Sequence, residues 1–137
     1  MIRTALAVVA GFVVWFLVAT AVNLGLRLSW PEYAQVEKAM QFTLAMKWAR
    51  LAMGAISSLA AGYAASRAGR HGRAAVVATG LLLLALFVPI HYGLWDRFPV
   101  WYHLTFLLSL FPLTVLGGRL DARPVAAQGR YTGGAPA

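Results

Sequence analysis

Hydrophobic positions in this chain form long unbroken runs instead of the alternating or striped patterns of water-soluble elements. Charged residues fall between four uncharged stretches, at residues 4–26, 51–66, 74–95 and 98–118. A helix that crosses the hydrocarbon of a bilayer needs about 20 apolar residues at a rise of about 1.5 Å each. Three stretches reach that length. The second is shorter, but the aliphatic parts of Lys47 and Arg50 can lie along the membrane while their charges reach the headgroups, which extends this stretch back to residue 48.

The runs predict an all-α integral membrane protein, an up-and-down bundle of four transmembrane helices that forms one domain over residues 1–120. The expected helices cover residues 4–26, 48–66, 74–95 and 99–118. Short turns after Ser66 and Trp95 make consecutive helices antiparallel neighbours. Any single run could instead be a buried helix of a soluble protein. With 12% charged residues, however, the chain has too few polar side chains to cover four such runs.

The N-terminus allows a second interpretation, because Arg3, the apolar run and the small residues at 19–21 imitate a cleaved signal peptide. The run continues without charge to residue 26, which is longer than a typical signal core. We therefore expect an uncleaved first helix. A cleaved signal would leave three spans and would place the termini on opposite sides.

The segment between the first two runs is too polar to cross a membrane, but it has a helical pattern. Ser29 and Glu32 have the spacing of a capping box, and Pro31 suits a first turn. Apolar residues then recur at intervals of three and four, which predicts an amphipathic interfacial helix over residues 30–46. The alternative is an extension of the helix that follows. After residue 120 no apolar periodicity exists, so residues 121–137 are predicted to be a disordered cytoplasmic tail.

The net charge of +8 indicates an orientation in the membrane. Seven of the twelve Lys and Arg residues lie near the N-terminus, in the turn around Arg70 and in the tail, and five lie on the opposite side. The positive-inside rule therefore favours cytoplasmic termini in a bacterial inner membrane. Trp and Tyr gather on the other side, as expected at a headgroup interface. Because the arginines flank spans, they predict contact with the lipid bilayer and argue against binding of nucleic acid.

Small residues recur every fourth position in the second span, at Gly54, Ser58, Gly62 and Ser66. Such a stripe lets a second helix approach closely, and that helix belongs either to this chain or to another subunit. Two prolines interrupt later spans, Pro89 in the third and Pro112 in the fourth. Each removes a helical hydrogen bond, so kinks are expected there.

The outer turn of the second hairpin holds the best candidates for ligand binding. If the turn centres on Asp96, then His91 and His103 lie at a similar depth, where imidazoles could bind haem, a quinone or a metal. Two packed helices of one hairpin leave little room for a macrocycle, and a metal would lack further ligands. Ordinary hydrogen bonds of the histidines are the alternative. Arg50, about one turn inside the second span, needs a partner such as Glu37, Asp96 or a lipid phosphate.

The candidate chemistry is otherwise sparse. The chain has no cysteine, which excludes disulfides, thiolate catalysis and cysteine-bound metals. No acidic residue lies within an expected span, and no nucleophile with a base is apparent, so we expect neither an enzyme nor a bound cofactor or metal. The expected function is a non-catalytic accessory or assembly subunit with a membrane-protein partner. The alternatives are a homo-oligomeric transporter or channel, and haem or quinone binding through His91 and His103.

Overall fold

The structure, a computed structural model, describes residues 1–121, and its regular secondary structure is entirely helical. The elements are α1 (Ile2–Ser29), α2 (Pro31–Val36), α3 (Leu44–Ala68), α4 (Arg73–Gly93), the 3-10 helix η1 (Trp95–Arg97) and α5 (Val100–Asp121). No strand is present within residues 1–121. The predicted all-helical class is therefore confirmed. Except for its first residue, the predicted disordered tail lies outside the described residues.

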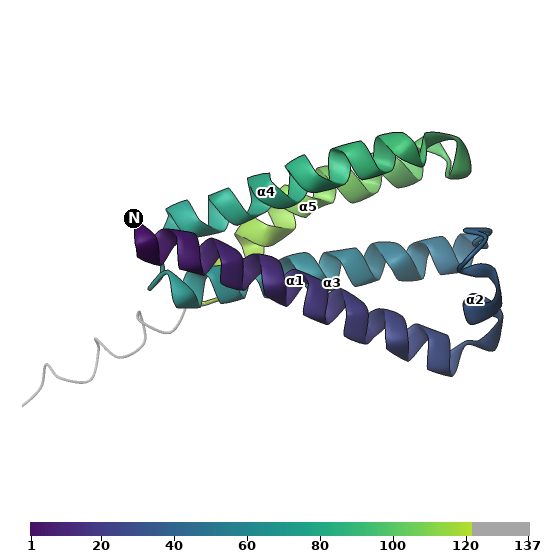
Figure 1. Ribbon diagram of the computed structural model, residues 1–137, viewed down its shortest axis with the longest axis horizontal. Helices are drawn as coiled ribbons and strands as arrows, with labels where there is room; N and C mark the ends of the chain where they lie inside the picture. Colours follow the sequence, from purple (N-terminus) through teal and green to yellow (C-terminus); the bar gives the residue numbers. More distant parts are fainter. Residues whose placement is uncertain (122–137) are drawn as a thin grey trace, which may run out of the picture.

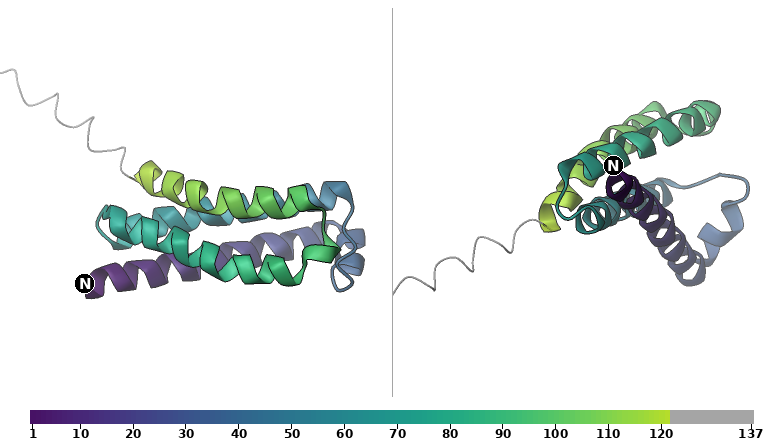
Figure 2. Two further views of the ribbon diagram at one scale, coloured as in Figure 1. Left: turned by 90° about the horizontal axis from the view of Figure 1, so that it is seen from above. Right: turned by 60° about the vertical axis from the view of Figure 1, so that its left-hand side comes forward.

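The four long helices run up and down beside one another, and α3 contacts α1, α4 and α5. Figure 1 shows the N-terminus, the α3–α4 turn and the end of α5 at one end of the bundle. We call this the arginine end, because Arg3, Arg67, Arg70, Arg73 and Arg119 lie there. The opposite end, which carries α2 and η1, is the aromatic end. The α1–α3 and α4–α5 pairs converge at the arginine end and diverge toward the aromatic end (Figures 1 and 2).

Within residues 1–121, three helices are long and apolar enough to cross a membrane, namely α1, α4 and α5. The helix α3 is also long, with 25 residues, but it is richer in alanine, serine and basic residues. Its central position explains this composition, because many of its small residues face other helices. The buried small residues of α3 are Gly54, Ser57, Ser58, Ala61, Gly62, Ala65 and Ser66.

The closest helix contact joins α3 to α5 near the arginine end. A Cβ atom built on Gly62 would overlap the carbonyl oxygen of Thr114, and one built on Gly117 would overlap the carbonyl oxygen of Leu59. Both positions therefore require glycine for the two backbones to touch. Along the same face, Gly54 leaves space for the ring of Phe106. The small-residue stripe thus contacts α5 of the same chain.

The segment between α1 and α3 differs from the predicted helix over residues 30–46. The helix α2 begins at Pro31, as expected, but it ends at Val36, and Met40 has a left-handed backbone with φ of 55°. A new helix then starts, because the Thr43 hydroxyl accepts a hydrogen bond from the Met46 N–H at 3.3 Å. This break turns the ring of Phe42 into the core.

The predicted capping box is also wrong. Ser29 is the last residue of α1, and its hydroxyl donates a hydrogen bond to the Gly25 carbonyl at 2.6 Å instead of capping α2. The two prolines lie inside helices that continue past them, Pro89 in α4 and Pro112 in α5. The kinks expected there stay a prediction.

Candidate functional site

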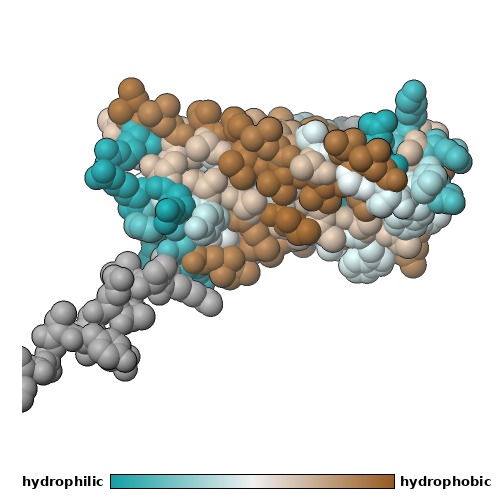
Figure 3. Space-filling view, turned by 90° about the horizontal axis from the view of Figure 1, so that it is seen from below, coloured by the Kyte–Doolittle hydropathy of each residue, from teal (hydrophilic) through white to brown (hydrophobic). Residues whose placement is uncertain are grey.

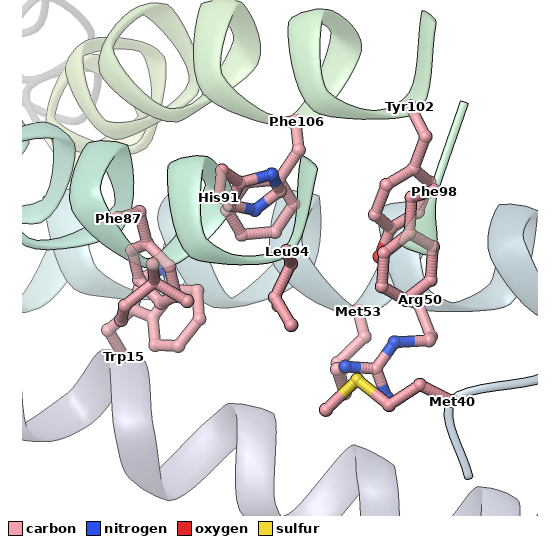
Figure 4. A pocket seen from close by; sticks show the side chains of 11 residues that line it. Trp15, Met40, Arg50, Met53, Phe87, His91, Leu94, Phe98, Tyr102 and Phe106 are labelled. Atoms are coloured by element: carbon pink, nitrogen blue, oxygen red, sulfur yellow. The ribbon is translucent and has the colours of Figure 1, made fainter. Parts of the chain in front are cut away.

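A cavity of about 110 Å³ lies between the helices toward the aromatic end, and the two sequence candidates Arg50 and His91 both line it (Figure 4). Most of the remaining lining is apolar or aromatic. It comes from α1, α3, α4, α5 and the segments between them, and includes Trp15, Met53, Phe87, Phe98, Tyr102 and Phe106. Aromatic rings are bulky, and their packing across this end keeps the helices apart.

His91 and His103 lie side by side, as their equal expected depth suggested. The two Nδ1 atoms are 2.8 Å apart, and both rings are buried, with 7% and 0% of their surface exposed. One Nδ1 must donate and the other accept, so at least one of the imidazoles is neutral. Trp95 stacks on His103, with the ring centroids 4.8 Å apart, and Phe106 stacks on His91 at 4.6 Å. The pair therefore joins α4 to α5 within an aromatic environment.

Arg50 belongs to a chain of hydrogen bonds that links α3 to α2 and α1. Its guanidinium donates to the Tyr33 hydroxyl at 2.8 Å, and that hydroxyl donates to Asn23 Oδ1 at 2.7 Å. The amide of Asn23 donates in turn to Glu37 Oε1 at 2.7 Å. Glu37 Oε2 lies 3.2 Å from Arg27 Nε. Glu37 thus reaches Arg50 only through two intermediates, while Arg50 also lies over the Phe42 ring, 4.6 Å from its centroid.

The side chain of Tyr33 is fully enclosed, and this burial has the largest influence on the pKa of its hydroxyl. Burial raises the pKa of this hydroxyl above its usual value, although the nearby Arg50 opposes the shift. The raised pKa keeps Tyr33 protonated at neutral pH, and a protonated hydroxyl can donate to Asn23 while it accepts from Arg50. The network therefore needs no change of protonation, and its role is to fix three helices relative to one another.

The residues of this site do not fit a haem or a metal ion. Two imidazole nitrogens bound to one tetrahedral zinc at about 2.0–2.1 Å would lie about 3.3 Å apart, which is longer than the direct contact of His91 and His103. Axial haem ligands lie on opposite faces of the macrocycle, so they cannot touch. Among residues 1–121, no group of three or more His, Asp or Glu side chains is placed to hold a metal. The cavity is also smaller than the roughly 300 Å³ typical of sites for larger ligands.

No known protein family, curated protein or solved structure matches this chain significantly. Asp96, the other candidate ligand in this region, lies exposed in η1 and forms no hydrogen bond or ion pair with the part of the chain that the structure describes. The structure brings His91 and His103 together and places Arg50 at the same cavity, but it leaves Asp96 outside.

Polar contacts at two further places were missed by sequence reasoning. Trp15 of α1 donates from Nε1 to the Ser58 hydroxyl of α3 at 3.1 Å, deep in the bundle. At the arginine end, the buried carboxylate of Asp121 lies 3.5 Å from Arg67 Nη1 and 2.9 Å from His71 Nδ1. The His71 contact is close but lacks the geometry of a well-directed hydrogen bond. Asp121 thus ends the helix α5, although this residue was predicted to belong to the tail.

Proposed function

We propose that this chain is a bacterial inner-membrane protein that crosses the bilayer four times and serves as a non-catalytic accessory or assembly subunit of a membrane complex. The four spans are α1, α3, α4 and α5, and both termini are cytoplasmic. The helix α3 is about 37 Å long at about 1.5 Å per residue, which exceeds a hydrocarbon thickness of about 30 Å. Figure 3 shows a hydrophobic belt between two hydrophilic ends, as a polytopic membrane protein requires.

The observation that carries the proposal is the use of the interior polar side chains. Several of these groups form a hydrogen bond with a side chain from another helix of this chain. They are the hydroxyl of Ser58, the imidazoles of His91 and His103, and the guanidinium of Arg50. Catalytic or transport sites need polar groups that are aimed at a ligand. Here those groups hold the helices together, which supports a structural role.

The outer surface of the long helices supplies the contact area for lipid or a partner. The helix α1 buries only Ala7, Gly11, Trp15 and Ala19 along its 28 residues. Several of its other large apolar side chains are exposed, and these follow one face at intervals of three and four. Members of this face include Leu6, Val9, Val13, Leu17, Leu24 and Leu28. A partner helix that packed here would bury apolar surface, and the contact would need no catalytic or ligand-binding residue.

Mild-detergent purification of the tagged chain from its native membrane tests this function. We expect a second membrane protein at a fixed ratio to the chain, identified by mass spectrometry. Mixing with isotope-labelled lysate before purification controls for partners acquired after lysis, because a native partner would carry no label. A monomer without a partner, in the same detergent that preserves other complexes, would contradict the accessory role.

One observation favours a second candidate, a homo-oligomeric transporter or channel. Thr105 and Pro112 are exposed on α5, and Leu108 between them is 72% exposed. Proline has no N–H, so the Leu108 carbonyl lacks its helical donor on a surface that would face lipid. Packing against a second copy would satisfy such polar atoms.

The natural absence of cysteine makes this candidate testable by crosslinking in native membranes. A Thr105→Cys chain would form disulfide-linked dimers if this α5 face joins two copies. The matched control is Leu82→Cys on α4, which is 44% exposed and lies on another helix. Dimers from Thr105→Cys alone would support a homo-oligomer, whereas no dimer from either variant would exclude this α5 contact.

A further inference from the structure

A second cavity, of about 200 Å³, lies at the arginine end between α4 and α5. Its wall divides into a basic part and an apolar part. The basic part consists of His71, Arg73 and Arg119, and the apolar part includes Val76, Val77 and Val115. Neither part takes any role in the contacts of the aromatic end.

Within residues 1–121, no carboxylate forms an ion pair with the arginines of this cavity. Three of the four acidic residues, Glu32, Glu37 and Asp96, lie at the aromatic end. The fourth, Asp121, already contacts Arg67 and His71. No acidic side chain of residues 1–121 forms an ion pair with Arg73 or Arg119, and residues 122–137 contain neither Asp nor Glu. Both residues are exposed, so their guanidinium groups are accessible to an anion from another molecule.

The backbone adds positive potential at the same place. The helix α4 begins at Arg73, and the residue before it, Gly72, provides no side-chain cap. The first N–H groups of α4 therefore lack partners and carry the positive end of the helix dipole. His71 is held beside the cavity by its contact with Asp121 and by a hydrogen bond of 2.7 Å from its N–H to the Ser66 carbonyl. The positive charge of Arg67, 3.5 Å from this carboxylate, reduces its repulsion of an anion.

We propose that this cavity binds the phosphate group of an anionic glycerophospholipid, with Arg73 and Arg119 as its ligands. The valine part of the wall opens toward the outer surface, where Val77 is 39% exposed and Leu81, one helical turn further along α4, is 53% exposed. An acyl chain can follow these side chains while the phosphate and glycerol occupy the cavity. Basic pockets between helices on the cytoplasmic side are suited to such headgroups. The inference rests on the proposed membrane crossing.

Native mass spectrometry of the full chain in detergent, after delipidation, tests the site. The probes are dihexanoyl phosphatidylglycerol and dihexanoyl phosphatidylcholine, which have the same acyl chains and differ in net charge. We expect the wild type to bind phosphatidylglycerol more tightly. The double variant Arg73→Gln with Arg119→Gln is expected to lose about thirtyfold in affinity for phosphatidylglycerol, since each arginine near a phosphate contributes about fivefold. Its weak binding of phosphatidylcholine should not change.

The matched control is Arg70→Gln, because Arg70 lies in the same turn but does not line the cavity. Arg70 therefore contributes only to the general positive potential of this end, which salt weakens, and we expect a change below about twofold. An equal loss in Arg70→Gln, or no loss in the double variant, would overturn the proposal in favour of a diffuse basic surface. Displacement of phosphatidylglycerol by equal concentrations of inorganic phosphate would also overturn it, because the source would then be a soluble phosphate.

Failure of this inference can be separated from failure of the proposed function. The chain has no cysteine, so single substitutions Lys38→Cys, Arg70→Cys and Asp96→Cys, labelled in native membranes, report whether all four helices cross. A chain that crosses four times but shows no preference for phosphatidylglycerol would reject the lipid site alone. A chain that does not insert would reject the membrane assignment as well.

Discussion

The two ends of the bundle are held together in opposite ways. At the arginine end, α3 and α5 touch backbone to backbone, because Gly62 and Gly117 have no side chains to separate them. At the aromatic end, the helices diverge (Figure 1). Large side chains fill the space there, and the ring of Phe42 packs against those of Tyr33 and Phe98. The bundle is therefore a wedge, with the cavity of about 110 Å³ toward its wider end.

This difference teaches which changes each end can tolerate. Backbone contact depends on the absence of side-chain atoms, so the arginine end should fail when atoms are added. The aromatic end depends on particular polar partners, such as the Arg50–Tyr33 and His91–His103 pairs, so it should fail when atoms are removed. Added bulk and deleted polar groups therefore test the two ends separately.

The largest effect is expected from Gly62→Ala. The new methyl group would overlap the Thr114 carbonyl and force α3 away from α5, which should lower the free energy of unfolding by about 3 kcal/mol. Unfolding by sodium dodecyl sulfate in mixed micelles measures this change. The control is Gly25→Ala, where a Cβ would meet no atom within 4 Å, and we expect no loss there. Equal effects of the two substitutions would show that α3 and α5 are not in close contact.

Tyr33→Phe should have the next largest effect, at the opposite end. The change removes the hydroxyl between Asn23 and Arg50 and leaves both without that partner, which should cost about 2 kcal/mol in the same unfolding assay. Tyr92→Phe is the control, because Tyr92 is 81% exposed. If Tyr33→Phe were as mild as its control, the hydrogen-bond chain would not support the aromatic end.

A double-mutant cycle at His91 and His103 should show a smaller, coupled effect. We expect a coupling free energy of about 1 kcal/mol between His91→Phe and His103→Phe, because either single change already breaks their shared hydrogen bond. Asp96→Asn, in the exposed turn between them, should change stability very little. Strictly additive effects of the two histidine variants would contradict direct contact.

The smallest effect is expected from Asp121→Asn at the arginine end. Its partners Arg67 and His71 are 65% and 51% exposed, so water screens both contacts. The loss of stability should be at most about 1 kcal/mol and should shrink at high salt. Thermal unfolding at low and high salt measures both. A loss as large as that of Gly62→Ala would mean that charge, and not backbone contact, holds this end.

Much of the fold could be predicted from the sequence because apolar runs report helices directly. Each of the four runs corresponds to one long helix, and Pro31 begins α2 as expected. The prediction of one helix over residues 30–46 was wrong, because apolar spacing alone does not reveal the left-handed backbone at Met40 or the new cap at Thr43. Local chemistry overrode the periodic pattern there.

The candidate site could be predicted only in part. His91 and His103 flank one short turn, so their equal depth followed from the hairpin. Other pairs join elements far apart in the chain, as Trp15 with Ser58 and Tyr33 with Arg50 do. Such pairs depend on how helices rotate against one another, which no local pattern fixes. For the same reason, the sequence left open whether Arg50 reaches the headgroups or pairs with Glu37, Asp96 or a lipid phosphate. Its guanidinium instead donates to the hydroxyl of Tyr33, and its side chain lines the cavity (Figure 4).

The most direct test of the proposed four-span topology is to determine on which side of the membrane the turns before and after α3 lie. The cysteine-free chain allows single substitutions Lys38→Cys, Arg70→Cys and Asp96→Cys, each labelled in intact cells with a membrane-impermeant maleimide. A four-span protein with cytoplasmic termini predicts that Lys38→Cys and Asp96→Cys react from outside, and that Arg70→Cys reacts only after permeabilisation. Labelling of Lys38→Cys and Arg70→Cys from the same side would show that α3 does not cross, and would contradict the account.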